Sequence, residues 1–484
     1  MTISAIVLLL CSVLRAVYVP ITIDEARSIL DFSSRSVWNI ISFGEDCASA
    51  NNHILNTLLI KLSNGVLGPG ELAHRFPSLL SHAFFLFFSI RVAGRVKNMF
   101  PSLCLFFLIN TQPYLFDFFS LARGYGLAMA FLMMAIYYLL CYAHKSSPRL
   151  ATLCVVFSSM AMLSNFSSLV FLLAMCGALV CSFHIQHKEL ERREYRKALL
   201  ANVRYPIIIL LIMGIIVFEP VRKLKAFGDL YYGGEKGFWE DTVGSLANSL
   251  AYSATYQSIF VLTLKLFVGC TIILALVWFV INVFKSSRAI IRSNFVLVFF
   301  TLLLAVLITM VEFHLIHIKF LIGRTAMQFV LLFAVVFGFF LDDFTSAVKS
   351  AKWIVAPISL IAILACVGHF SSAFNLQTTN EWKFDSDSRN VIADIQNDVV
   401  ASGTKNQRIA LACSWPPIAG LNYYRIIHKQ DWLLPIEEDT IRRRVDYYYL
   451  MKWLKPYNFD TLEIVKDYPN SGGVLVKPKN KSNK

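Results

Sequence analysis

The chain leaves its first apolar segment in the stretch Tyr18-Val19-Pro20-Ile21-Thr22-Ile23-Asp24-Glu25-Ala26-Arg27. The apolar segment, residues 3–20, is long enough to cross a bilayer, since a spanning helix needs roughly 17–25 predominantly apolar residues. It lacks a basic region at its start and a small-residue cleavage site at its end, so we expect a retained span rather than a signal peptide. Two adjacent carboxylates, Asp24 and Glu25, therefore follow directly on a membrane span.

The composition of the whole chain is that of a membrane protein. Hydrophobic residues make up 56% of the 484 residues and charged residues 16%, and the mean hydropathy is +0.58. These values are too apolar for an ordinary soluble domain. Together with the first span, the apolar runs predict about eleven transmembrane helices. The further runs lie at 76–94, 100–118, 124–143, 150–165, 167–184, 205–220, 257–283, 294–313, 323–341 and 352–370.

The net charge of +14 is placed in a way that argues against nucleic-acid binding. Most basic residues lie in short segments between apolar runs, where Lys and Arg mark the cytoplasmic side of a membrane protein. The clusters fall on every second connection, at 91–97, 145–149, 187–204, 285–292 and 349–352. Alternation then places the remaining loops, with Asp24 and Glu25, on the extracytoplasmic side, and a bacterial inner membrane is the expected location.

The predicted architecture is a polytopic α-helical membrane protein with a small soluble domain. Residues 1–370 form the transmembrane domain, with a first outer loop at 21–75 and a second long outer loop at 221–256. Within the first loop, 34–43 and 51–67 carry apolar residues at helical spacing, which predicts two amphipathic helices on the membrane surface. Residues 371–484 form an extracytoplasmic α/β domain, with a helix at 388–400 and strands at 409–413 and 472–476.

The cysteines and histidines give little support to a metal or redox centre. The ten cysteines show no CxxC spacing, and only Cys47 and Cys413 look exposed. Glu312, His314 and His317 have a metal-like spacing on one helical face, but such a cluster alone is weak support. The sequence requires no cofactor, and a divalent metal remains an option.

Cations at the outer ends of spans run against the usual charge bias. Arg123, Lys319 and Arg324 lie at such ends, where a guanidinium or an ammonium would meet an anion such as a lipid phosphate. The alternative is that these long side chains reach to the interface to keep their charges in water.

The first outer loop offers groups for proton transfer and substrate binding. Asp24 would serve as a general base, and the alternative is that it caps the helix that follows. Asn51, Asn52 and His53 would bind a polar substrate, or else mark another helix start. In the second long outer loop, the segment 231–239, which contains Trp239, would stack on sugar rings or belong to an interfacial aromatic belt.

The order of four motifs resembles the GT-C glycosyltransferase superfamily, most closely the branch of bacterial protein O-mannosyltransferase-like and aminoarabinose-transferase-like enzymes. The motifs are the acidic pair after the first span, Asn51-Asn52-His53-Ile54-Leu55, the Arg-Phe-Pro-Ser segment at 75–78, and Ala122-Arg123-Gly124-Tyr125-Gly126-Leu127. The sequence departs from the commoner pattern at Ile54, where many members have Pro, and at Thr325, where many have Tyr. The sugar and the acceptor are therefore left open.

The resemblance implies transfer of a hexose or pentose from a polyprenyl-phosphate carrier to an acceptor hydroxyl, with inversion. Membrane lipids surround the protein, and the acceptor is a glycan, a lipid or a protein. Asp24 would act as the base, and Arg123 would neutralise the carrier phosphate as it leaves. Glu25 is a second catalytic candidate, and the alternative is that it orients Arg27 or a nearby helix. The remaining candidates are Tyr125, Arg324 and Lys319 for the donor phosphate, and Asn52, His53, Asp117 and Trp239 for substrate.

Two other function classes compete with this interpretation. A flippase or transporter of lipid-linked sugars would tend to show repeated halves with broken helices at the midplane, and the sequence shows no such repeat. A polymerase or ligase for lipid-linked glycans is closer in chemistry. It would use a diphosphate-linked oligosaccharide instead of a monophosphate-linked single sugar.

Overall fold

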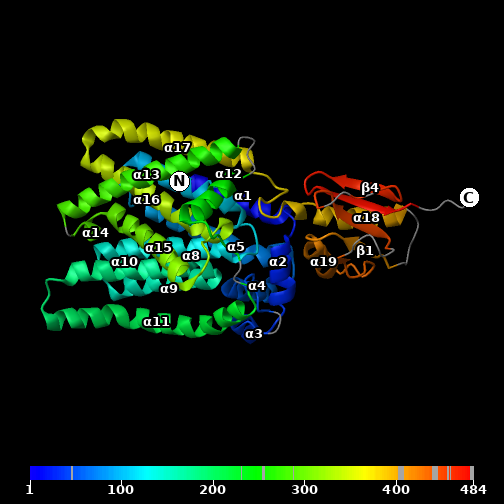
Figure 1. Cartoon of the computed structure of the whole chain (residues 1–484), viewed down its shortest axis with the longest axis horizontal. Coiled ribbons are helices and arrows are strands. Elements are labelled where there is room, and N and C mark those ends of the chain that lie inside the picture. The colour runs from blue at the N-terminus through cyan, green and yellow to red at the C-terminus, as the bar shows by residue number, and fades with distance from the viewer. Residues whose placement is uncertain are drawn as a thin grey trace, which may run out of the picture.

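The computed structural model describes residues 1–44, 47–229, 232–252, 257–286, 288–401, 408–438, 445–454, 457 and 459–479. Within these residues the protein has two parts, a large bundle of helices and a smaller sheet-containing part at one end of it (Figure 1). The helices of the bundle run roughly side by side along its long axis, and the C-terminal part continues that axis (Figure 1).

The helical part begins with α1 and ends with α17. Its longer helices are α1 (Thr2–Tyr18), α4 (Ile54–Leu67), α5 (Glu71–Ala93), α6 (Met99–Asn110), α8 (Gly124–His144), α9 (Pro148–Ser164), α10 (Leu169–His187), α11 (Arg192–Ala226), α13 (Gln257–Lys285), α15 (Asn294–Ile316), α16 (Met327–Ala347) and α17 (Lys352–Ala373). Short helices join them: α2 (Ile23–Arg27), η1 (Ser28–Phe32), α3 (Val37–Ser42), α7 (Pro113–Asp117), η3 (Phe166–Ser168), η4 (Phe238–Val243), α12 (Gly244–Ala251), α14 (Ala289–Arg292), η5 (Gly323–Ala326) and η6 (Lys349–Ala351).

The structure is that of an integral, multi-pass membrane protein. Among the described residues, eight helices are long and apolar enough to cross a membrane, or nine if α1 and the segment 23–32, bent by 76° from it, count as one span. A helix occupies each of the eleven apolar runs, but α6 and α9 are shorter apolar helices that do not meet this length test alone. The count of eleven therefore stays a prediction.

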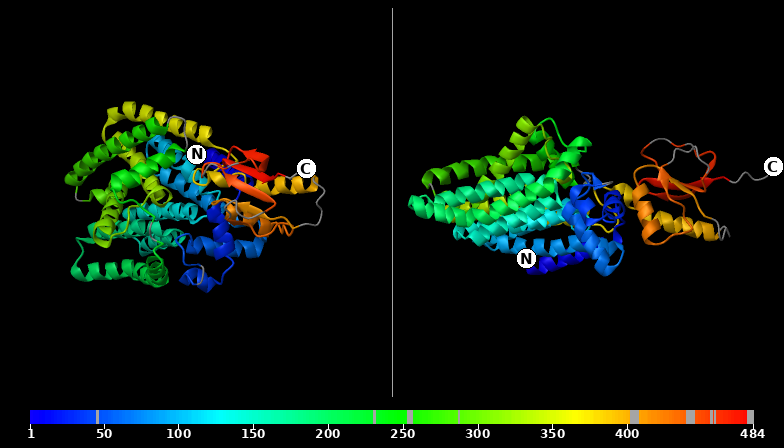
Figure 2. Two further views of the ribbon diagram at one scale, coloured as in Figure 1. Left: turned by 45° about the vertical axis from the view of Figure 1, so that its right-hand side comes forward. Right: turned by 90° about the horizontal axis from the view of Figure 1, so that it is seen from below.

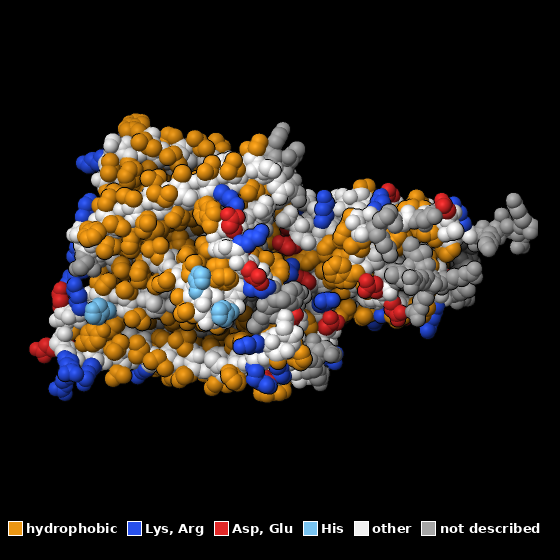
Figure 3. Space-filling model, in the orientation of Figure 1, with side chains coloured by type: hydrophobic (Ala, Val, Ile, Leu, Met, Phe, Trp, Pro, Cys, Tyr) orange, Lys and Arg blue, Asp and Glu red, His pale blue; other side chains and the backbone are white. Residues whose placement is uncertain are grey.

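The centre of the bundle is formed by α8 and α16. In their most apolar windows 78% and 83% of residues are buried, against 6% for α11 and 11% for α13. The outer helices thus present apolar side chains at the surface, as the broad orange area of the bundle shows (Figure 3). Basic side chains gather at the end of the bundle away from the C-terminal part (Figure 3).

The C-terminal part is a five-stranded mixed sheet with helices beside it. Strands β1 (Leu411–Cys413), β2 (Glu437–Glu438), β3 (Tyr447–Met451), β4 (Leu462–Tyr468) and β5 (Gly473–Pro478) lie in the order β2-β1-β3-β5-β4. β1 is parallel to β2 and β3, and β5 is antiparallel to β3 and β4. Helices α18 (Ser388–Ala401) and α19 (Ile418–Ile427) precede and follow β1, and η7 (Lys383–Asp385) leads into α18.

The first loop lies at the junction of the two parts. Figure 2 shows its blue segments between the helical bundle and the orange and red C-terminal part. The two predicted amphipathic segments contain α3 and α4, and the acidic pair lies on the separate short helix α2. Because α19 packs against α2, the C-terminal part contacts the element that carries Asp24.

Two expectations from the sequence are wrong. Cys47 and Cys413 are both fully buried, because polar sequence neighbours do not show which tertiary contacts cover a residue. Helix α11 begins at Arg192 rather than near 205, so much of the basic run 187–204 is helical. Arg, Lys and Glu are good helix formers, and hydropathy reports where a helix enters lipid rather than where it begins.

Candidate functional site

Helix α2 is only five residues long and is defined by its N-terminal cap. The cap is Thr22, whose hydroxyl accepts from the Glu25 amide while the Glu25 side chain accepts from the Thr22 amide, as in a capping box. Asp24 therefore is not the cap, and that alternative from the sequence is wrong. Its carboxylate is left for other contacts.

Three side chains accept hydrogen bonds from the backbone amides just before Asp24. The Ile21 amide donates to the Tyr424 hydroxyl at 2.8 Å, the Thr22 amide to Glu25 Oε2 at 3.0 Å, and the Ile23 amide to Asp385 Oδ2 at 2.7 Å. Tyr424 and Asp385 belong to the C-terminal part. Sequence reasoning missed both, since they lie hundreds of residues from α2.

Glu25 is fully engaged with the fold. Its side chain is completely buried and makes two 2.8 Å hydrogen bonds with the Arg75 guanidinium, one through each carboxylate oxygen. It also accepts from the Ala122 amide at 2.7 Å. Burial alone raises the pKa of Glu25, but the charge and hydrogen bonds of Arg75 bring the pKa below its ordinary value. The geometry therefore favours Glu25 as a structural anion that fixes α2 rather than as a group that meets substrate.

We expect Arg75→Gln to destabilise the protein strongly. Besides Glu25, the guanidinium holds the carbonyls of Ala16, Val19 and Pro20, so its loss leaves a buried carboxylate and three carbonyls without this partner. Breaking a buried pair in this way costs about 3–5 kcal/mol. Thermal unfolding of the purified protein in detergent would show a lower midpoint. Lys197→Gln, which removes an exposed ion pair with Glu194, is the control, and equal midpoints for the two variants would contradict the prediction.

The Asp24 carboxylate has one satisfied oxygen and one oxygen without a hydrogen bond. Oδ1 accepts from the Asn51 side-chain amide at 3.1 Å, whereas the buried Oδ2 has no hydrogen-bond partner among the described residues. Oδ2 lies 3.6 Å from Arg123 Nη2 and 3.3 Å from Arg324 Nη1. Burial by itself raises the pKa of Asp24, and the two guanidinium groups outweigh burial and hold it below the ordinary value. Asp24 is thus ionised at neutral pH, and its Oδ2 can accept a hydrogen bond or a proton from a ligand.

Arg123 binds groups of the protein itself. It is fully buried, and its Nη1 donates to the Ser28 hydroxyl at 2.8 Å and to the Asp24 carbonyl at 3.2 Å. Its Nη2 donates to Asn51 Oδ1 at 2.9 Å and contacts His53 Nε2 at 3.0 Å. These contacts favour a role for Arg123 in orienting Asp24 and the Asn51–His53 segment. Its positive charge still acts on the Asp24 carboxylate, which lies 3.6 Å from Nη2.

The contact with Arg123 fixes the protonation of His53. An Arg side chain only donates hydrogen bonds, so His53 Nε2 must accept and the ring proton lies on Nδ1. Burial lowers the pKa of His53 well below its ordinary value, and the charges of Arg123 and Arg324 lower it further. His53 is therefore neutral. Its ring packs edge-on against Tyr125, with 5.0 Å between the ring centroids.

Gly124 makes this arrangement sterically possible. A Cβ atom at position 124 would lie 1.9 Å from the Ser164 carbonyl oxygen and 2.9 Å from the His53 ring. No side chain can therefore replace the glycine without moving α8 or His53. Glycine is thus required between Arg123 and Tyr125 because the Ser164 carbonyl and His53 pack directly against this position.

Arg324 is the cation of the site that reaches solvent. Its side chain is 20% exposed, its Nη1 lies 3.8 Å from Glu381 Oε2, and its buried Nε has no hydrogen-bond partner in the described part of the chain. The guanidinium carbon lies 5.2 Å from the ring centre of Trp382 and 5.6 Å from that of Tyr232. Two aromatic faces thus flank a guanidinium with free donors, an arrangement suited to an incoming anion.

The structure brings five sequence candidates together and separates others from them. Asp24, His53, Arg123, Tyr125 and Arg324 form one cluster. Asn52 lies next to it but is buried, with its amide donating to the Ile40 and Cys47 carbonyls and its oxygen accepting from Thr57. Its neighbour Asn51, which the sequence offers with Asn52 and His53 for binding a polar substrate, instead bridges Asp24 and Arg123.

The other candidates make contacts elsewhere. Asp117 is buried between Arg15, Tyr252 and the Asn380 amide, and Lys319 pairs with Glu235 at 2.7 Å. Trp239 is 44% exposed, with its ring against Gly269 of α13. His314 and His317 are exposed, and no group of three metal-ligating side chains is found in the described part of the chain. Glu45, Asp46 and Tyr231, which belong to the predicted loops, lie outside the described residues.

Comparisons with known proteins give similarity at the level of structure. No model of a known protein family matches the sequence, and no curated protein matches it. Among solved structures, the chain is similar to ArnT from Cupriavidus metallidurans bound to undecaprenyl phosphate, with 10% identity, coverage of 98% of this chain and 96% of that one, and a TM-score of 0.43. It is also similar to the archaeal oligosaccharyltransferase AglB from Archaeoglobus fulgidus in complex with an inhibitory peptide and a dolichol-phosphate, with 10% identity, coverage of 93% and 69%, and a TM-score of 0.46. Such scores mark a loose likeness, so the function has to be argued from the site.

Proposed function

We propose that the protein is a membrane glycosyltransferase that moves a hexose or pentose from a polyprenyl-phosphate carrier to an acceptor hydroxyl on the extracytoplasmic face. The observation that carries the proposal is the free Oδ2 of Asp24, an ionised and buried oxygen between two guanidinium groups. Glycosyl transfer needs a base for the acceptor and a cation for the leaving phosphate. This site offers both, with Asp24 Oδ2 and Arg324 Nη1 3.3 Å apart.

Each group has a defined task in the proposed reaction. Asp24 Oδ2 takes the proton of the acceptor hydroxyl as the acceptor oxygen forms its bond to the anomeric carbon. The bond from that carbon to the carrier phosphate breaks, and the phosphate leaves with the electron pair. Arg324, which is partly exposed and has free donors, balances the added negative charge. Attack from the face opposite the leaving group inverts the anomeric carbon.

Arg123, His53 and Asn51 act as positioning residues in this proposal. Arg123 joins the Asp24 carbonyl, Ser28 and Asn51, so it fixes the orientation of α2 relative to α8. Neutral His53 accepts from Arg123 and leaves the guanidinium fully charged near Asp24. The site thereby keeps its base ionised and in one place before substrate arrives.

Mass spectrometry of lipids that co-purify with the protein tests the proposal directly. We expect a polyprenyl-phosphate-linked single sugar, which should be consumed when the purified protein is incubated with a competent acceptor. Diphosphate-linked oligosaccharides alone would assign the protein to the polymerases or ligases instead. Movement of the carrier across proteoliposome membranes without formation of a glycosidic bond would assign it to the flippases.

A further inference from the structure

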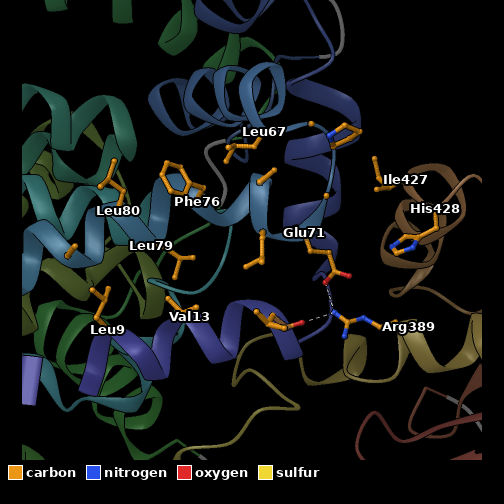
Figure 4. Close-up of a pocket in the computed structure, with 17 residues that line it drawn as sticks. Leu9, Val13, Leu67, Glu71, Phe76, Leu79, Leu80, Arg389, Ile427 and His428 are labelled. Carbon is orange, nitrogen blue, oxygen red and sulfur yellow. Dashed lines mark hydrogen bonds and ion pairs between the residues drawn. The ribbon is translucent and has the colours of Figure 1, made fainter. Parts of the chain in front are cut away.

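A pocket lies away from Asp24, between α1, α5 and the C-terminal part. It has a volume of about 1060 Å³ and shares no lining residue with the Asp24 cluster. Its walls are apolar side chains of two helices in the membrane part, among them Leu9, Val13, Phe76 and Leu80. Figure 4 shows these side chains on α1 and α5, with Arg389 and His428 at the opposite end.

The pocket is an open groove on the lipid-facing surface rather than a closed cavity. Val13, Leu72, Phe76 and Leu80 are between 36% and 47% exposed, so the groove opens sideways where lipid surrounds the bundle. Along α5 its lining runs from Leu72 to Ala83, which is about 17 Å at 1.5 Å per residue. One leaflet of a bilayer has a hydrocarbon depth of about 15 Å. The groove therefore fits an acyl chain of a lipid that stays in its own leaflet.

The polar end of the groove carries hydrogen-bond donors without partners. Arg389 donates through Nη2 to Glu71 at 2.5 Å and to the Val17 carbonyl at 3.2 Å, and no described residue bonds its buried Nε. The exposed His428 imidazole lines the same end. Glu71 does not repel an anion strongly here, because it is paired with Arg389 and lies 3.9 Å from Arg75.

We propose that this groove binds a bilayer phospholipid, with an acyl chain between α1 and α5 and the phosphate on Arg389 and His428. The depth of one leaflet, the sideways opening and a guanidinium at headgroup level point to this occupant. Because Arg389 lies on α18 and His428 follows α19, the lipid joins the C-terminal part to the membrane part. The inference goes beyond the proposed function and does not depend on it.

Thermal unfolding in detergent with added lipid tests the groove. A ligand that binds only the folded protein raises the unfolding midpoint. Phosphatidylglycerol should therefore raise it, whereas diacylglycerol with the same chains and inorganic phosphate should not. Arg389→Gln should weaken phosphatidylglycerol binding about tenfold, since hydrogen bonds from a charged donor are lost. Ala83→Phe, which fills the groove, should also abolish the shift.

The controls separate this site from the catalytic one. Lys452→Gln removes a surface cation paired with Asp467 in the same part of the chain and should keep the full shift. Asp24→Asn should keep it too, whether or not the protein transfers sugar. An undiminished shift in Arg389→Gln, an equal shift with diacylglycerol, or a shift with inorganic phosphate alone would overturn the proposal. Stronger stabilisation by polyprenyl phosphate through Arg389 would assign the groove to the carrier instead.

Discussion

Asp24→Asn is expected to reduce sugar transfer by roughly 10²–10⁴-fold, the usual contribution of a positioned general base. The amide has the same shape, and its oxygen can still accept from Asn51 as Oδ1 does. It cannot take a proton from the acceptor hydroxyl. The variant should therefore keep its fold, with lower stability because two guanidinium groups lose their counter-ion, while its kcat falls.

The KM for the donor distinguishes a lost base from a damaged site. Removing the negative charge leaves Arg123 and Arg324 uncompensated, so the donor phosphate should bind as well as before or more tightly. Steady-state kinetics with varied donor concentration measure both constants. Asp31→Asn, in the turn of η1 that follows, is the control and should keep normal activity. A normal kcat for Asp24→Asn would remove Asp24 from the reaction.

Arg324→Gln is expected to lower kcat/KM for the donor by about 10²–10³-fold, the range seen when one donor to a developing oxyanion is removed. The loss should appear largely in kcat, since the added negative charge on the phosphate develops only as its bond to the sugar breaks. Arg324→Lys should recover only part of it, since an ammonium restores the charge but not the planar pair of donors. Arg222→Gln, which removes an exposed Arg paired with Glu219, is the matched control. Equal donor kinetics in the Arg324 and Arg222 variants would contradict the assignment.

The pH dependence gives a second readout for Arg324. Burial raises the pKa of Asp24, and Arg123 and Arg324 lower it, so transfer by the wild type should persist below the ordinary pKa of a carboxyl group. Without Arg324 the pKa of Asp24 is higher, and the acid limb of kcat/KM should move to higher pH. In the wild type, we expect the donor phosphate to compete with Asp24 for Arg324 and so to raise the pKa of Asp24. The acid limb of kcat should therefore lie at higher pH than that of kcat/KM.

The parts of this structure that were predictable depend on local properties of the sequence. Hydropathy located each apolar helix, and the alternation of loop charges placed Asp24, His53, Arg123 and Arg324 on one side, where the structure has them in contact. It was not predictable that Asn51 rather than Asn52 would contact Asp24. The outcome depends on the direction in which one backbone turn points each side-chain amide. Nor was the role of Glu25 predictable, since its partner Arg75 lies 50 residues later.

The anchoring of α2 by Asp385 and Tyr424 sets an order of events during synthesis. Asp385 lies 362 residues after Ile23, which is roughly 20–70 s of elongation at 5–20 residues per second. Until that time the Ile21 and Ile23 amides lack their acceptors, so the helix that carries the carboxylate is incompletely held. For a nascent chain already seated in the membrane, we therefore expect the proposed transfer activity to begin only when the tail has been translated and has docked.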